Sequence, residues 1–266
     1  MTIAHTTPQI VDFHTHVWPN SVAAKAVATI TEFPVRGDGT VTGLVADQKA
    51  AGVDLSVCLF FALRADTVDS VNSFAGSLDR SHFIPFGTIH PDLTPEENLA
   101  SLQGAGVRGV KVHPTFQRYT LDDPRVYDML EAVAGSYPVV FHVGAGAGAD
   151  GSGATPRMIR DISRALPTLK VIAAHFGGYR VIQDSLQELV GTSVYLDTSW
   201  PPSLAALDPT TVTSIINRHG SDRILFASDW PTASPGDEIA ALRNLNLPDE
   251  DTKAILGGNA VKLLHL

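Results

Sequence analysis

Two histidines separated by one residue end the first apolar run of the chain. The run Ile10-Val11-Asp12-Phe13 leads directly into His14-Thr15-His16. In an extended strand, residues i and i+2 point to the same face and lie about 7 Å apart along the strand. Such a pair can begin a metal site, but the chain has 10 histidines, and chance alone can supply this spacing. The pair indicates a metal site only if further ligand-type residues stand at the ends of other apolar runs.

Ligand-type side chains recur at the ends of later apolar runs. They are His14, His16, His90, His113, His142, His175 and Asp229. The remaining histidines, His5, His82, His219 and His265, stand elsewhere and are taken as structural or surface residues. Neutral imidazoles of His14, His16 and His142 suit a divalent ion. The carboxylate of Asp229 completes a set that leaves a position for water, and the single cysteine argues against a closed structural zinc site.

This ligand set predicts hydrolytic chemistry. A bound divalent ion lowers the pKa of water towards ~7 and polarises a substrate carbonyl. We therefore predict two catalytic residues, Asp229 to accept the proton of the water and His175 to give electrophilic or acid–base help.

Lys111 and His113 form a second group of candidates, for a second metal or for substrate binding. They are two residues apart on one apolar run and therefore share a face. Lys111 either pairs with Asp229 or another carboxylate of the site, or it is carbamylated and bridges two ions. His113-Pro114 and His90-Pro91 can also simply turn the chain, because a residue before proline avoids the helical region.

Aromatic side chains follow several of the apolar runs. They are Trp18, Phe116, Tyr119, Tyr179, Trp200 and Trp230. We expect them to line a substrate pocket, although aromatic residues in loops also pack locally.

A glycine-rich segment offers an alternative function. Residues 144–153 contain Gly-x-Gly-x-x-Gly at Gly146, Gly148 and Gly151, the pattern of a dinucleotide-binding turn. An acidic residue that binds ribose is expected after the next strand, where this chain has Ala174-His175. We therefore interpret the segment as a loop beside the metal site.

The elements that must position these residues alternate between strands and helices. Eight short apolar runs are predicted as strands: 9–13, 54–60, 82–89, 107–112, 139–143, 169–174, 193–196 and 223–227. Between them, helix starts share a capping residue followed by proline: Thr94-Pro95, Asp123-Pro124, Thr155-Pro156, Asp208-Pro209 and Ser234-Pro235. Thr94 with Glu97 forms a capping box. This alternation predicts an α/β fold, one (β/α)8 TIM barrel spanning residues 1–266. Active sites of such barrels lie at the carboxyl ends of the strands, where the candidate residues stand.

The charge and cysteine content of the chain limit the kinds of binding partner and the cellular compartment that we expect. The net charge is -9, with 19 basic and 28 acidic residues, so nucleic acid and anionic membranes are poor partners and a small molecule fits better. Cys58 stands alone in an apolar run, and no run approaches the length of a membrane span. We expect a cytoplasmic protein.

The quoted residues resemble the amidohydrolase superfamily, in particular the amidohydrolase-2 branch that includes aminocarboxymuconate semialdehyde decarboxylase and related small hydrolases. The matching stretches run from Val11-Asp-Phe-His14-Thr-His16 through Gly109-Val-Lys111-Val-His113-Pro, Val140-Phe-His142-Val-Gly, Val171-Ile-Ala-Ala-His175-Phe-Gly-Gly and Tyr195-Leu-Asp-Thr-Ser199 to Arg223-Ile-Leu-Phe-Ala-Ser-Asp229-Trp-Pro. The resemblance implies a barrel with one zinc, or a similar manganese, iron, cobalt or nickel ion, held by His14, His16, His142 and Asp229. It also implies a catalytic His175 and favours a homodimer. Ala227 stands where the family commonly has glycine.

Three hypotheses follow. The first is a metal-dependent hydrolase that cleaves an amide, ester or lactone bond of a small molecule. The second keeps the metal but removes carbon dioxide from a small unsaturated or aromatic acid without oxidation. The third, from another class, is a catalytically silent barrel that binds a ligand or a nucleotide.

Overall fold

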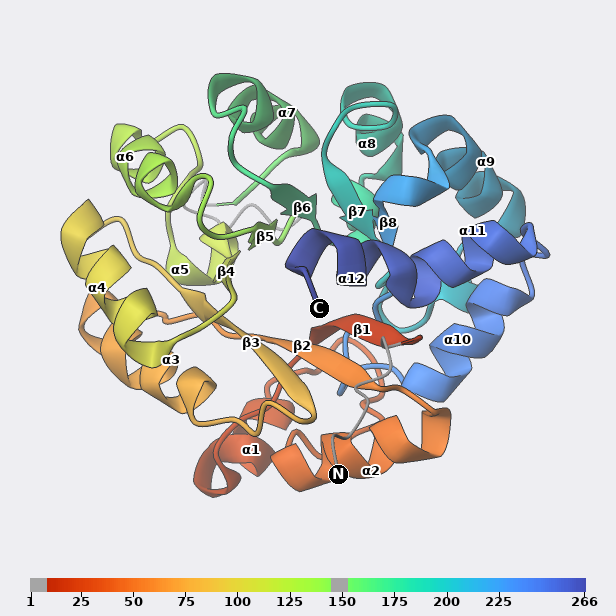
Figure 1. Ribbon diagram of the computed structural model, residues 1–266, viewed down its shortest axis with the longest axis horizontal. Coiled ribbons are helices and arrows are strands. Elements are labelled where there is room, and N and C mark those ends of the chain that lie inside the picture. Colours follow the sequence, from red (N-terminus) through yellow and green to blue (C-terminus); the bar gives the residue numbers. More distant parts are fainter. Residues whose placement is uncertain (1–8, 145–152) are drawn as a thin grey trace, which may run out of the picture.

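Eight parallel strands form the centre of the molecule in the computed structural model (Figure 1), which describes residues 9–144 and 153–266. Each strand pairs with the next along the chain, in the order β1 to β8. Their bounds are Val11–Thr15 (β1), Leu55–Leu59 (β2), Phe83–Thr88 (β3), Gly109–Val112 (β4), Val139–Phe141 (β5), Val171–Ala173 (β6), Tyr195–Asp197 (β7) and Ile224–Leu225 (β8). Every predicted strand is present, shifted or shortened by a few residues at its ends.

Helices surround the strands, as Figure 1 shows in a view down the barrel. Their bounds are Asn20–Val27 (α1), Val41–Ala51 (α2), Val68–Gly76 (α3), Pro95–Ala105 (α4), Pro114–Gln117 (α5), Pro124–Val133 (α6), Pro156–Ala165 (α7), Ile182–Glu188 (α8), Pro209–His219 (α9), Pro235–Arg243 (α10), Asp249–Lys253 (α11) and Asn259–Leu264 (α12). The five predicted caps Thr94, Asp123, Thr155, Asp208 and Ser234 all accept a backbone N–H in the first turn. The capping box of Thr94 and Glu97 is also confirmed.

Two apolar layers hold the barrel together. The inner layer lies inside the strands and includes Phe13, Phe86 and Ile172, while a larger layer packs the outer strand faces against the helices. Helix α12 covers the end of the barrel where the strands begin, since Ala260 and Leu264 belong to the inner layer (Figure 1). The opposite end, where the strands finish, is left for the candidate site.

The first strand closes the barrel against the segment that contains β8. Phe13 N donates to Phe226 O at 2.8 Å, and Asp229 N donates to His14 O at 2.8 Å. The predicted TIM barrel in a single domain is therefore confirmed. Among the described residues, no helix is long and apolar enough to cross a membrane.

Candidate active site

A change of register in β1 aims both of its histidines into the barrel. Asp12 pairs with Ser56 and Thr15 with Cys58. Between these two pairs, β1 therefore contains one residue more than β2. Phe13 lies in the inner apolar layer, and strict alternation would then turn His14 outwards. The extra residue lets His14 follow Phe13 on the inner side, while Thr15 turns outwards to donate to Val57 O at 2.9 Å. Such bulges commonly aim a side chain beside an active site.

The hydrogen bonds of His14 and His16 leave their Nε2 lone pairs free. His16 Nδ1 lies 3.0 Å from the carbonyl oxygen of Leu59, which can only accept, so Nδ1 carries the proton. His14 Nδ1 lies 2.8 Å from Asp197 Oδ2, which assigns the same tautomer. Both Nε2 atoms are then acceptors, in the form that binds a metal ion.

Three acceptor atoms converge at one point. His14 Nε2 and His16 Nε2 are 3.1 Å apart, and Asp229 Oδ1 lies 3.4 Å and 3.3 Å from them. Three ligands placed about 2.1 Å from one ion in tetrahedral directions are separated by about 3.4 Å. Three lone pairs at these distances repel one another unless a cation lies between them. The donor set and its dimensions therefore fit a divalent ion, as the grouping of His14, His16 and Asp229 also indicates.

The protonation states agree with this fit. Burial lowers the pKa of His14 well below its ordinary value, and the nearby charge of Lys111 adds to this effect. Burial would raise the pKa of Asp229, but His14, His16 and His175 outweigh it and lower that pKa to about 2. Near neutral pH, His14 is thus a neutral imidazole and Asp229 an ionised carboxylate, the forms that bind metals.

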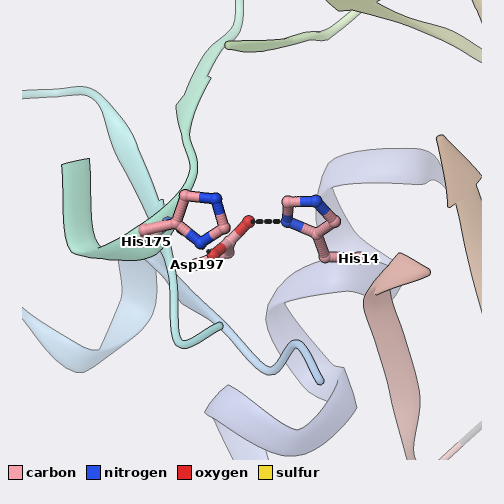
Figure 2. A group of neighbouring side chains, drawn as sticks. All are labelled: His14, His175 and Asp197. Atoms are coloured by element: carbon pink, nitrogen blue, oxygen red, sulfur yellow. Dashed lines mark hydrogen bonds and ion pairs between the residues drawn. The ribbon is translucent and has the colours of Figure 1, made fainter. Parts of the chain in front are cut away.

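Asp197 joins His14 to His175, as Figure 2 shows. Its Oδ2 accepts from His14 Nδ1, and its Oδ1 accepts from His175 N at 2.9 Å. Ser199 Oγ donates to Asp197 Oδ1 at 2.5 Å and lies 2.8 Å from His175 Nδ1. Because this hydroxyl proton is directed to Asp197, Ser199 Oγ accepts from His175 Nδ1, which leaves Nε2 of His175 as a lone-pair acceptor.

His142 extends this chain of hydrogen bonds. Its Nδ1 lies 3.1 Å from His175 Nε2 and donates to it, so its own Nε2 is free. Burial lowers the pKa of both His142 and His175, and both rings are neutral near pH 7. His142 lies outside the group of His14, His16 and Asp229. The structure thus brings three of the four predicted ligands together and places the fourth against the predicted catalytic histidine.

Two of the candidate residues have an unusual backbone. His175 and Asp229 both have φ of 60°, in the left-handed region that residues other than glycine seldom adopt. Thr232 fixes Asp229, since its N and its Oγ1 both donate to Asp229 O, at 2.9 Å and 2.6 Å. Strained backbone of this kind persists where the surroundings over-determine it, which is common at active sites.

Lys111 is buried in the same end of the barrel. Its neighbours Val110 and Val112 pack in the outer layer, so its side chain faces the interior and is only 1% exposed. Burial lowers the pKa of Lys111 to about 8, against the carboxylates of Asp197 and Asp229, which raise it. Asp197 and Asp229 thus act on Lys111 through their charges, but Lys111 Nζ makes no hydrogen bond or ion pair with either of them within the described part of the chain, so the predicted pairing stays a prediction.

A stack of rings leads from the site to the surface. The ring centroids of His142 and His113 are 4.0 Å apart with an interplanar angle of 9°, and Phe116 follows His113 at 4.1 Å. Phe61 lies against both His113 and Phe116. Phe116 is 55% exposed and forms the outer end of the stack. His113 also caps α5, so it both turns the chain and lines the site.

The other predicted pocket residues divide into two groups. Trp18 stacks on His16 at 6.2 Å, while Tyr179 contacts both His175 and Trp200. Trp230, in contrast, is fully buried, and its Nε1 donates to Asp47 Oδ2 at 2.7 Å, so it offers no surface to a ligand.

Tyr119 is buried as well and donates to Gln117. Two further histidines have structural contacts. His90, which the sequence places among the strand-end candidates or in a turn, is buried in a turn and accepts from Asp92 N. His219, predicted as a structural or surface residue, bonds to Val194 O at 2.8 Å.

Sequence reasoning gave no role to three residues that support the site. Asp197 and Ser199 stand in a matching stretch, but nothing in their spacing indicates which atoms they contact. Asp12 is fully buried and accepts from Ser228 N at 2.9 Å, which ties β1 to the segment after β8. The glycine pattern at residues 146–151 lies outside the described residues.

The fold and the site define a TIM barrel with a candidate metal centre at the carboxyl ends of its strands. The amidohydrolase family matches residues 11–266. The chain belongs to this family, and the expected resemblance to amidohydrolases is confirmed. Family membership makes the protein an amidohydrolase-type enzyme.

Solved structures share this fold at low identity. A protein of Pseudomonas putida assigned as a 2-pyrone-4,6-dicarboxylic acid hydrolase has a TM-score of 0.69 and 20% identity, covering 98% of each chain. The 5-carboxyvanillate decarboxylase of Sphingomonas paucimobilis has a TM-score of 0.71 and 15% identity, covering 97% of this chain and 99% of the other. A dihydroxybenzoic acid decarboxylase of Polaromonas, solved with manganese, has a TM-score of 0.71, 18% identity and 97% coverage of both chains. A search of curated proteins finds no match.

Proposed function

We propose that the protein is a metal-dependent hydrolase that cleaves an amide, ester or lactone bond of a small molecule. The observation that carries this proposal is the convergence of His14 Nε2, His16 Nε2 and Asp229 Oδ1 within 3.4 Å of one another. These three residues would hold one divalent ion, with Nε2 of His142 as the proposed fourth ligand. When bound, the ion supplies an acidified water and polarises the substrate carbonyl.

The side chains around this ion would transfer protons, orient His175 and contact the substrate. Asp229 accepts a proton through its second carboxylate oxygen. His175 is neutral and its Nε2 lone pair accepts from His142 Nδ1, so it serves as a base when the substrate or water replaces that donor, and then, once protonated, as an acid towards the leaving group. Asp197 and Ser199 hold the His175 ring in this tautomer through its Nδ1. Trp18 and Tyr179 border the site on the sides of His16 and His175.

Metal content and metal-dependent turnover test the proposal. The purified protein should contain about one divalent ion per chain, and His14→Ala should lose both the ion and the activity against a panel of small esters, amides and lactones. Replacing exposed His82 by alanine is the matched control and should change neither. A protein without bound metal, or undiminished hydrolysis in His14→Ala, would show the proposal to be wrong.

Non-oxidative decarboxylation is a second candidate, favoured by the aromatic rings of Phe61 and Phe116 that lie against His113. Aromatic surroundings suit a conjugated substrate ring, which can take up the electron pair left when a carboxyl group departs. His175 would then handle the proton that replaces the carboxyl group. Carbon dioxide release from a panel of aromatic and unsaturated acids distinguishes this reaction from hydrolysis.

We further propose zinc as the ion, with manganese, iron, cobalt or nickel as the alternatives, and a homodimer as the oligomeric state. Elemental analysis of the purified protein identifies the ion. Light scattering during size-exclusion chromatography measures the oligomeric state.

A further inference from the structure

Lys111 is a buried cation with unused hydrogen-bonding capacity. Its ammonium group has three donors and no hydrogen-bond partner among the described residues, although its side chain is 1% exposed. Burying an unpaired charge is costly, so such groups are normally paired or hydrogen-bonded. Lys111 is an exception to this rule, and it lies among the residues proposed for catalysis.

The neighbours of Lys111 show where its charge is directed. Asp197 and Asp229 favour its charged form, while the ammonium opposes protonation of His14 and His113. Lys111 therefore lies close enough to these side chains for their charges to interact, at the end of the barrel that holds the candidate metal ligands. It balances part of the carboxylate charge, but none of its three donors is used by those carboxylates.

Charge counting indicates the missing partner. Asp197 and Asp229 contribute two negative charges near the ammonium, and Lys111 with one divalent ion would contribute three positive charges. With neutral water on the ion, the surplus is one positive charge, which a singly charged anion would neutralise. A carboxylate has two acceptor oxygens, so it can place one on the ammonium group.

We propose that Lys111 is a specificity residue that binds a carboxylate or similar planar oxyanion of the substrate. The proposal rests on the metal-dependent function proposed above, and it names the class of substrate as a small monoanionic acid. His113 stands two residues after Lys111, and Phe116 stacks on His113 at 4.1 Å, so aromatic side chains near Lys111 suit an acid with a conjugated group. Carbamylation of Lys111 is the competing reading, and it would replace the cation by a third negative charge beside Asp197 and Asp229.

Calorimetric titration of matched ligand pairs tests the proposal. Formate, acetate and benzoate are compared with formamide, acetamide and benzamide, on wild type and on Lys111→Met. We expect at least one anion to bind wild type more tightly than its amide, and this preference to decrease by about 10- to 100-fold in Lys111→Met, the usual effect of losing a hydrogen bond to a charged group. Lys170→Met is the matched control, since Lys170 is exposed at the opposite end of the barrel, before β6.

Metal content separates this proposal from the one on which it rests. Lys111→Met removes a positive charge near the candidate ligands, so it should keep its metal ion. Wild type without any metal would overturn the proposed function, whereas a metal-loaded Lys111→Met with an unchanged preference for anions overturns the role of Lys111. No preference for any anion in wild type, or a carboxyl group added to Lys111 in the mass of that peptide, overturns it as well.

A measurement on wild type covers the case in which Lys111→Met does not fold. With lysine labelled by ¹⁵N, the Nζ signal of the buried lysine should shift when the preferred anion is added and stay in place with the corresponding amide. The exposed Lys170 provides the reference signal. Equal responses of the two lysines would contradict the proposal.

Discussion

Replacing Asp197 by asparagine isolates one hydrogen bond of the candidate metal centre. Three of the four donors to Asp197 reach Oδ1: His175 N at 2.9 Å, Ser199 N at 3.1 Å and Ser199 Oγ at 2.5 Å. Only His14 Nδ1 reaches Oδ2, at 2.8 Å. Asparagine has the same shape and can keep its oxygen at the first position, so among the hydrogen bonds of residue 197 only the one to His14 changes, from an acceptor to an N–H donor.

The tautomer of His14 should then reverse. An amide N–H facing Nδ1 requires that nitrogen to accept, which moves the proton of the ring to Nε2. Nε2 lies 3.4 Å from Asp229 Oδ1 and 3.1 Å from His16 Nε2, so the moved proton occupies the position proposed for the ion. Losing such a supporting contact typically lowers metal affinity by roughly 10- to 100-fold, or about 1.4 to 2.7 kcal/mol.

The stability of the metal-free protein should change little, because the proton on Nε2 gains Asp229 as its acceptor. We expect the free energy of unfolding without metal to change by less than about 1 kcal/mol. Asp197→Asn should therefore bind the metal ion more weakly while the metal-free protein keeps its stability, and this combination distinguishes a changed tautomer from general damage to the fold.

Competition with a chelator for zinc, together with urea unfolding of the metal-free protein, measures both quantities. Asp222→Asn is the matched control, since the Asp222 side chain is 63% exposed and outside the site. A folded Asp197→Asn protein with the metal affinity of wild type would refute the reasoning. So would a loss of stability large enough to explain the loss of metal.

Three further predictions concern metal removal, pH and the ring stack. Removing the ion with a chelator should lower the melting temperature and metal addition should restore it, because three acceptors then face one another; an unchanged melting temperature would argue against the site. Burial raises the pKa of Glu238 from 4.5 to about 7, although Ser203 and Leu204 donate to it. Its stabilising contribution is complete below pH 4.5 and disappears as the pH rises through 7, so the unfolding free energy of wild type should decrease over this range by about 3 kcal/mol more than that of Glu238→Gln; parallel urea-unfolding curves would contradict this. Phe116→Ala should leave the free energy of unfolding within about 0.5 kcal/mol of wild type, since this side chain is 55% exposed, while weakening the binding of benzoate; equal benzoate affinity in a titration would exclude the ring stack from substrate binding.

Much of the fold could be predicted because its signals are local. Buried parallel strands require continuous apolar runs. The apolar run at 139–143, for example, contains strand β5 at Val139–Phe141. The cap residues Thr94 and Asp208 act within their own first turns, so their roles follow from three or four neighbouring residues. Strand ends meet at one end of a barrel, which is why His14 and Asp229 could be placed together across the length of the chain.

The chemistry of the site could not be predicted to the same depth, because it depends on contacts between segments far apart in the chain. The sequence by itself determined that histidines and an aspartate would meet at the strand ends. Only the tertiary structure decided that a bulge aims His14 inwards, that Asp197 sets its tautomer, and that His142 bonds to His175. It also decided that Lys111 is buried without a hydrogen-bond partner among the described residues. The physical reason is that an apolar run or a helix cap is specified by neighbours in sequence, whereas a proton's position is specified by whichever donor and acceptor folding brings within about 3 Å.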